Sequence, residues 1–249
     1  MIDEARNRSV IGRLLEELSW VGSTIRDYRQ GGRGYENVLT AEVLLALDFL
    51  PRRAFFGRVI EGAVGATEAR RSFLATIEEA AFTLLPGNHE LSKTVSVQPD
   101  GIIESPSSFA LVEAKRIKSS AFQSEQLARE YLLLLRDSAR KTVPPKTPLF
   151  LLILGQPPPV RVKGNGRMEI KQALSRDLRA VHKKSDALGF GIERAEELVD
   201  KVVCWTTWDR IAQAIRAAQL EFKVDDASLK GTVDRLAASA LAAIEWHSK

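Results

Sequence analysis

The sequence predicts an α/β fold of the α+β type, with a mixed central sheet flanked by helices and additional helices at both ends of the chain. The hydrophobic period changes from helical in the first third to strand-like over 89–116, and then becomes helical again. An apolar run at 148–155 is too short for a buried helix and predicts a central strand covered on both faces. With 249 residues, 45% hydrophobic and 27% charged, the chain has the composition of one globular domain spanning 1–249.

The first third of the chain is expected to be helical, because apolar residues recur there at three- and four-residue spacings. The predicted helices span 4–28, 36–50 and 67–85, and they end before breakers at 31–34, 51 and 86–87. We interpret residues 1–30 as an N-terminal helical extension that precedes a core at 34–155.

Three strands and a helix are predicted to form the centre of that core. The strands span 89–97, 98–104 and 109–116, and turn-forming residues at 105–108 join the last two strands into a hairpin. A helix is expected from a capping box at Ser120 and Gln123 to about Arg140. The strand at 148–155 follows it.

The remaining chain, 156–249, is interpreted as a C-terminal elaboration of the same domain. Its predicted elements are a helix near 168–187, a strand at 199–205, a helix after Thr206, and a C-terminal helix whose apolar residues run from 229 to 244.

Composition excludes several classes of protein. Cys204 is the only cysteine, so there is no disulfide framework, and three histidines without nearby thiols give no zinc-site spacing. No apolar run approaches the ~20 residues that cross a bilayer, and Met1–Glu4 lacks the basic-then-apolar order of a signal peptide. We expect a cytoplasmic protein with no membrane role.

The predicted hairpin brings charged residues together. If 105–108 form a four-residue loop, position 104 faces 109, and by the same register Asp100 faces Glu113. Directly opposed residues on antiparallel strands have Cβ atoms about 4.5–5.5 Å apart, so two acids there need a cation between them or a shared proton. Lys115 lies two residues after Glu113 and therefore points to the same face.

Two carboxylates without imidazole or thiolate neighbours suit Mg²⁺, with Mn²⁺ as the alternative. Such a metal polarises a phosphate and lowers the pKa of a bound water, and Lys115 would orient that water or offset developing negative charge. Asp100, Glu113 and Lys115 therefore predict hydrolysis of a phosphodiester bond.

The residues Pro99-Asp100 and Glu113-Ala114-Lys115 resemble the signature of the PD-(D/E)XK nuclease superfamily, which has the restriction-endonuclease-like fold. The resemblance covers about residues 34–155 and implies a helix, three strands, a second helix and a fourth strand, with the helix at 67–85 as an insertion. It implies a Mg²⁺-dependent deoxyribonuclease that acts on DNA, with RNA as the alternative substrate. It suggests a role in defence, repair or recombination, as a homodimer or as a subunit of a complex.

The resemblance also implies two further site residues. Many members place a glutamate of the first core helix at the metal, and Glu36 is the candidate here. Some members carry a glutamine and a tyrosine four residues apart on the helix after the lysine. In this chain Gln126 is followed by Glu130 at that spacing, and Tyr131 comes one residue later.

Other interpretations stay open at this stage. The Glu-x-Lys tripeptide recurs at 169–171 and 221–223, so the hairpin charges have an alternative explanation as an ordinary surface hairpin. Glu36 would also complement a helix dipole, and Gln126 would also suit an ordinary polar helix position. A different class of function is a non-catalytic nucleic-acid-binding or assembly subunit that keeps the nuclease fold.

Positive charge concentrates at 161–184, where eight Lys and Arg residues stand against two acids, although the net charge of the whole chain is only +4. Such clustering is typical of a surface that binds a polyanion, and a solvated helix face gives the same pattern. The candidate nucleic-acid-binding residues are Arg161, Lys163, Arg167 and Lys171, together with Arg33 near Glu36.

Overall fold

A computed structural model describes residues 35–118, 121–140, 144–185 and 188–248. The predicted helix at 4–28 and Arg33 lie outside the described residues. Glu36 lies in the first turn of a described helix, but its side chain is not among the described parts.

A six-stranded mixed sheet forms the centre of the fold, as predicted. Its order is β1 (Val64–Gly65), β10 (Val203–Thr207), β7 (Thr147–Leu154), β6 (Ser108–Ala114), β5 (Gly101–Glu104) and β2 (Ala81–Leu84). The β10–β7 and β7–β6 pairs are parallel, and the other pairs are antiparallel. The carboxyl ends of three strands, β6, β7 and β10, therefore meet at one edge of the sheet.

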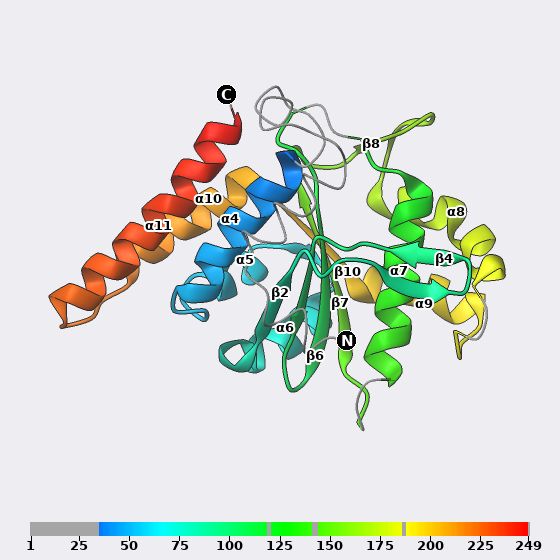
Figure 1. Ribbon diagram of the computed structural model, residues 1–249, viewed down its shortest axis with the longest axis horizontal. Coiled ribbons are helices and arrows are strands. Elements are labelled where there is room, and N and C mark those ends of the chain that lie inside the picture. The colour runs from blue at the N-terminus through cyan, green and yellow to red at the C-terminus, as the bar shows by residue number, and fades with distance from the viewer. Residues whose placement is uncertain (1–34, 119–120, 141–143, 186–187, 249) are drawn as a thin grey trace.

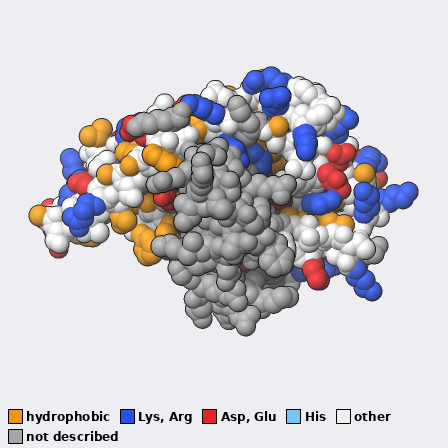
Figure 2. Space-filling model, turned by 45° about the horizontal axis from the view of Figure 1, so that its top comes forward, with side chains coloured by type: hydrophobic (Ala, Val, Ile, Leu, Met, Phe, Trp, Pro, Cys, Tyr) orange, Lys and Arg blue, Asp and Glu red, His pale blue; other side chains and the backbone are white. Residues whose placement is uncertain are grey.

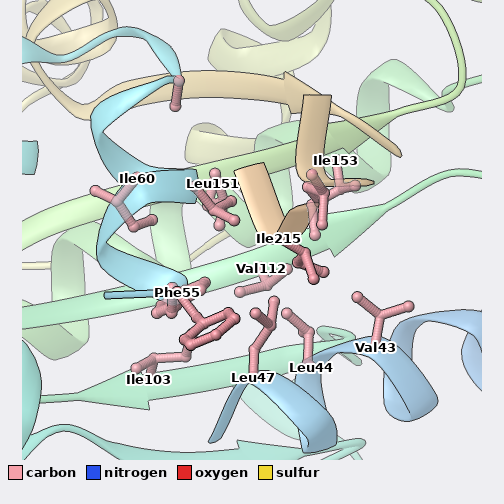
Figure 3. Close-up of a cluster of buried hydrophobic side chains, with 14 of the residues drawn as sticks. Val43, Leu44, Leu47, Phe55, Ile60, Ile103, Val112, Leu151, Ile153 and Ile215 are labelled. Atoms are coloured by element: carbon pink, nitrogen blue, oxygen red, sulfur yellow. The ribbon is translucent and has the colours of Figure 1, made fainter. Parts of the chain in front are cut away.

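One face of the sheet packs against helices from both ends of the described chain. These are α4 (Tyr35–Phe49), α5 (Phe56–Glu61), α6 (Thr67–Ala75), α10 (Trp208–Glu221) and α11 (Ala227–Ser248), with a 3₁₀ turn η1 (Ile77–Glu79) after α6. Figure 3 shows this core, where Leu44 and Leu47 of α4 and Ile215 of α10 approach Val112 of β6. The N-terminal helix of the core and the C-terminal elaboration thus share one hydrophobic layer.

The other face packs against α7 (Ser124–Arg140), α8 (Ile170–Lys184) and α9 (Ile192–Val202). Two small hairpins lie on the same side, β3 (His89–Ser92) with β4 (Val95–Val97), and β8 (Val160–Val162) with β9 (Gly166–Met168). Figure 1 shows the resulting three layers, with α4, α10 and α11 to the left of the sheet and α7, α8 and α9 to its right. None of the described helices is long and apolar enough to cross a membrane.

The central strand was correctly predicted. In β7, Leu149, Leu151 and Ile153 enter the core on the α4 face, while Phe150 and Leu152 enter the core on the α7 face. A strand that is buried on both faces has no polar alternation, which explains the continuous apolar run.

The hairpin register was also correctly predicted. Glu104 pairs with Phe109, and the ladder continues to Gly101 opposite Val112. Side-chain hydroxyls hold the connecting loop, because Thr76 donates to Ser105 at 2.8 Å and Ser107 donates to the carbonyl of Ser72 at 2.9 Å.

The predicted helix at 67–85 was wrong in its second half. Helix α6 ends at Ala75, η1 follows, and residues 81–84 form β2, which pairs antiparallel with β5. Apolar residues at this spacing fit an edge strand as well as a helix, and the partner strand that decides between them is 17 or more residues away in the chain.

Three further boundaries differ from the predictions. Residues 89–97 form the β3–β4 hairpin outside the central sheet, helix α7 begins at Ser124 instead of Ser120, and residues 192–202 form α9, so the strand expected at 199–205 begins at Val203. The start of α7 is delayed because Phe122 bridges to Val162 of β8. Strand β10 begins where its pairing with β7 begins, at Val203 opposite Phe150, so contacts between distant segments set these two boundaries.

Candidate active site

The candidate site lies at the carboxyl end of β6, on the face covered by α7. Val112 and Ala114 belong to the core on the opposite face, so Glu113 and Lys115 point toward α7. Beyond the end of the strand, the amide of Lys115 donates to the carbonyl of Ile153 at 2.8 Å and prolongs the pairing with β7. The backbone that carries the lysine is therefore fixed by the sheet.

Glu113 and Lys115 form a buried ion pair. The Lys115 ammonium contacts Glu113 Oε1, and the two side chains are only 9% and 2% exposed, respectively. The ammonium also lies 5.3 Å from the centre of the Phe122 ring, a cation–π arrangement that stabilises the charge. A buried ion pair of this kind adds little to stability, because desolvation offsets the attraction between the charges.

Asp100 lies beside this pair. Its carboxylate Oδ2 accepts a hydrogen bond from the amide of Ala114 at 2.7 Å, and its carbonyl accepts one from the amide of Leu85 at 2.9 Å. Both bonds hold Asp100 at the end of the hairpin, next to the residue that the register predicted it would face. The side chain is buried, with 9% of the residue exposed.

Helix α7 adds two polar residues to the cluster. Gln126 Nε2 donates to Glu113 Oε1 at 3.0 Å and to Glu130 Oε1 at 2.8 Å. The structure therefore places Gln126 beside Glu113 in the candidate site.

Glu130 is a site residue that the sequence analysis did not propose. It is fully buried, and its Oε2 has no hydrogen-bond partner among the described residues. Burial is the main cause that raises its pKa well above the usual value, and the neighbouring Glu113 carboxylate raises it further, whereas Lys115 and Gln126 act in the opposite direction. The available signal was its spacing, because positions 126 and 130 share one face of a helix.

The donor set fits a hard cation of the Mg²⁺ type. Glu113 on β6 and Asp100, directly before β5, are carboxylates, and Mg²⁺ sites typically use only one or two protein carboxylates, with waters and substrate phosphate as the other ligands. Within the described part of the chain, no three His, Cys, Asp or Glu side chains are grouped closely enough to hold a metal ion by themselves. If a cation of this type binds here, Asp100 and Glu113 are the carboxylates that would hold it.

Two residues from other elements shape the backbone at Lys115. The indole Nε1 of Trp208, which follows β10, donates to the Lys115 carbonyl at 2.7 Å. At Gly155, directly after β7, a Cβ atom would overlap the carbonyl oxygens of Arg116 and Ile117. Position 155 therefore accepts only glycine while the chain after Lys115 keeps this path.

A pocket of about 200 Å³ opens beside Lys115. Its apolar wall includes Phe122 and Leu154, and its basic wall consists of Arg161 and Arg167 from the β8–β9 hairpin. Two of the four predicted nucleic-acid-binding residues in the basic segment thus lie at the same pocket as the candidate catalytic lysine.

The other predicted basic residues lie elsewhere. Lys163 is exposed at the end of the hairpin, after β8, whereas Lys171 on α8 forms an ion pair with Asp200 on α9. In Figure 2, Lys and Arg side chains gather over the right side of the molecule, the side of α8 and the β8–β9 hairpin. The basic segment is therefore divided between a hairpin at the pocket and a helix whose charges are partly paired.

Comparisons of the chain with family models, with curated proteins and with solved structures gave no match.

Proposed function

We propose that this protein is a metal-dependent nuclease that hydrolyses phosphodiester bonds of DNA, with RNA as the alternative substrate. The observation that carries the proposal is the burial of Asp100, Glu113 and Lys115 together at the carboxyl end of β6, where Lys115 opens onto a pocket with two arginines. Buried charges are costly to a fold, and clusters of this kind are typical of catalytic sites.

The order of elements supports the resemblance to the PD-(D/E)XK superfamily. Helix α4 precedes β2, β5 and β6, α7 follows, and β7 is the next strand of the central sheet. With α5 to η1 and the β3–β4 hairpin set apart as insertions, this is the order of one helix, three strands, one helix and one strand that the resemblance implies, although the first strand is β2 and not the segment at 89–97.

The residues of the chain would divide the chemistry between them. Asp100 and Glu113 would hold Mg²⁺ or Mn²⁺, and when bound the metal supplies polarisation of the phosphate and a lowered pKa for water. Lys115, positioned by its contact with Glu113, would place a positive charge where negative charge develops on the phosphate oxygens. Gln126 would orient Glu113 through its hydrogen bond, and Phe122 and Leu154 would form the apolar wall of the pocket beside Lys115.

The test is a cleavage assay with the purified full-length protein. Duplex DNA, single-stranded DNA and RNA are each incubated with Mg²⁺, with Mn²⁺ or with EDTA, alongside Asp100→Asn as the site variant and Asp200→Asn as the surface control. We expect cleavage that requires a metal and is lost only in Asp100→Asn. Binding of nucleic acid without cleavage under any of these conditions would assign the protein to the non-catalytic alternative.

We also propose that the protein acts in the cytoplasm. Cys204 is a free, buried thiol, which suits a reducing compartment.

A further inference from the structure

The two arginines of the pocket lie directly opposite each other. In the β8–β9 ladder, Arg161 pairs in register with Arg167, flanked by the pairs of Val160 with Met168 and Val162 with Gly166. Like charges at facing positions of an antiparallel pair repel each other and destabilise the hairpin. An anion bound between them would attract both guanidinium groups and offset that repulsion.

The basic residues of this region differ in their ion pairs. In the part of the chain that the structure describes, neither Arg161 nor Arg167 forms an ion pair with an acid, whereas Arg179 and Lys171 of the adjoining helix pair with Glu196 and Asp200. Arg167 Nε donates to the carbonyl of Pro159 at 3.0 Å, which fixes the root of its guanidinium and leaves the terminal nitrogens for a ligand.

The hairpin is held against the candidate active site. The amide of Phe122 donates to the carbonyl of Arg161 at 2.9 Å, and the amide of Lys163 donates to the carbonyl of Phe122 at the same distance. Phe122 is itself buried, and its ring faces the Lys115 ammonium. One residue therefore ties the arginine pair to the lysine on a fixed backbone.

The size of the pocket indicates the kind of anion. At about 200 Å³ it is smaller than the ~300–1,000 Å³ of pockets that enclose a whole drug-sized ligand. A pocket of this volume suits a small anion or one group of a larger molecule. A phosphate group of a polymer fits this limit, and paired guanidinium groups are well suited to its oxygens.

We propose that Arg161 and Arg167 together bind a single phosphate of a nucleic-acid strand, adjacent to the phosphate on which Lys115 acts. This inference rests on the proposed function, because it takes Lys115 as the catalytic group. It adds that the basic hairpin is a subsite for one phosphate, shared by two arginines, and is not a diffuse electrostatic surface.

The test measures binding of duplex DNA by fluorescence anisotropy in EDTA, where no cleavage occurs. The variants are Arg161→Ala, Arg167→Ala and the double variant, and the matched control is Arg179→Ala/Arg194→Ala, which removes the same charge from exposed ion-paired arginines. We expect each single variant to weaken binding about 10- to 100-fold, as for loss of a hydrogen bond to a charged group. The control changes affinity less than the single variants do.

The double variant carries the decisive measurement. If both arginines hold one phosphate, it weakens binding little more than either single variant, and the slope of log K against log[salt] falls in magnitude by about 0.9 in total. A fall of about 1.8, with additive losses of affinity, would mean two separate phosphate contacts and would overturn the shared subsite. Unchanged affinity in both single variants would overturn it as well.

Two further measurements distinguish a loss of folding from a loss of phosphate binding, and the phosphate subsite from the proposed nuclease function. Because each substitution removes like-charge repulsion, the thermal stability of the unliganded variants is expected to equal or exceed that of the wild type. If wild-type protein binds DNA without cleaving it, the proposed nuclease function fails, and the arginine pair is still judged by the binding data. If the wild type binds neither DNA nor RNA, the phosphate subsite is overturned directly.

Discussion

Two groups of charges on the same side of the sheet differ in their burial and therefore in their contribution to stability. At the candidate site, Glu113 and Lys115 form an ion pair that is almost fully buried beside the buried Glu130. Between α8 and α9, Lys171 pairs with Asp200 through side chains that are 57% and 67% exposed. Exposed pairs contribute about 0–1 kcal/mol, whereas breaking a buried pair costs about 3–5 kcal/mol, since it leaves an uncompensated charge.

The difference in burial between these two groups of charges indicates which of them is the better candidate for a functional site. The exposed pairs keep a helix surface solvated, and their loss is tolerated. Buried ion pairs of this kind are often not needed for stability, because apolar residues of similar size can fill the same space with little or no loss of free energy. Their presence agrees with the proposed nuclease function, which needs charge in a water-poor site.

The largest effect is expected for Asp100→Asn. Loss of a charged metal ligand removes an interaction worth several kcal/mol in the transition state, so the metal-dependent cleavage rate is expected to fall about 10³-fold or more. The Asn carbonyl oxygen can still accept the hydrogen bond from Ala114, so the unfolding midpoint in urea should stay near that of the wild type. Full activity in this variant would remove Asp100 from the mechanism.

The buried ion pair is best tested by a double-mutant cycle in urea. Glu113→Gln leaves the Lys115 ammonium buried without its carboxylate, and we expect a loss of about 3–5 kcal/mol. Adding Lys115→Met removes that charge, so the double variant should return to within about 1 kcal/mol of the wild type or exceed its stability. An additive loss in the double variant would show that the pair stabilises the fold outright.

The raised pKa of Glu130 predicts that the stability of the protein depends on pH. Its pKa is raised well above the ordinary 4.5, so between pH 4.5 and the folded-state pKa the native protein keeps a proton that the unfolded chain releases. The free energy of unfolding should therefore fall as pH rises through this range, by up to about 1.4 kcal/mol per pH unit.

Glu130→Gln is the matched comparison, because it keeps the shape and removes the titration. The difference in unfolding free energy between variant and wild type should grow with pH above 4.5 and be constant below it. Parallel curves over the whole range would contradict a buried, protonated Glu130.

The smallest effect is expected for the exposed pair. Lys171→Ala and Asp200→Ala should each change the unfolding free energy by less than about 1 kcal/mol, with a coupling energy in the same range. Lys171→Ala should also weaken DNA binding less than Arg161→Ala does, although the sequence suggested both residues for that role. A larger loss of DNA binding for Lys171→Ala would extend the nucleic-acid path onto α8.

The local sequence pattern was enough to predict part of the fold and the placement of the residues at the centre of the candidate site. The register of the β5–β6 hairpin follows from its loop length, and this alone predicted the placement of Asp100 next to Glu113. The apolar run of β7 predicted a central strand because a doubly covered strand leaves little room for alternatives.

The remaining features depend on contacts between distant segments. Strand β2 needs β5 as its partner, and the contact of Trp208 with the Lys115 carbonyl joins positions 93 residues apart. In the sequence Glu130 has the pattern of an ordinary helix residue. The packing of α7 brings the polar face of that helix, and Glu130 with it, close to Glu113. The facing positions of Arg161 and Arg167 follow from the register of the β8–β9 hairpin, and the sequence analysis predicted neither of these strands.

The crossing of chain segments at Gly155 has a consequence for how this protein tolerates change. A comprehensive mutational scan would find position 155 restricted to a single residue type, although it contributes no side chain to any reaction. Larger residues there would lift the segment at 116–117 and, with it, the lysine that precedes it. Intolerance to substitution at this position would therefore reflect the backbone path that positions Lys115, and a redesign of the pocket would have to begin from that backbone.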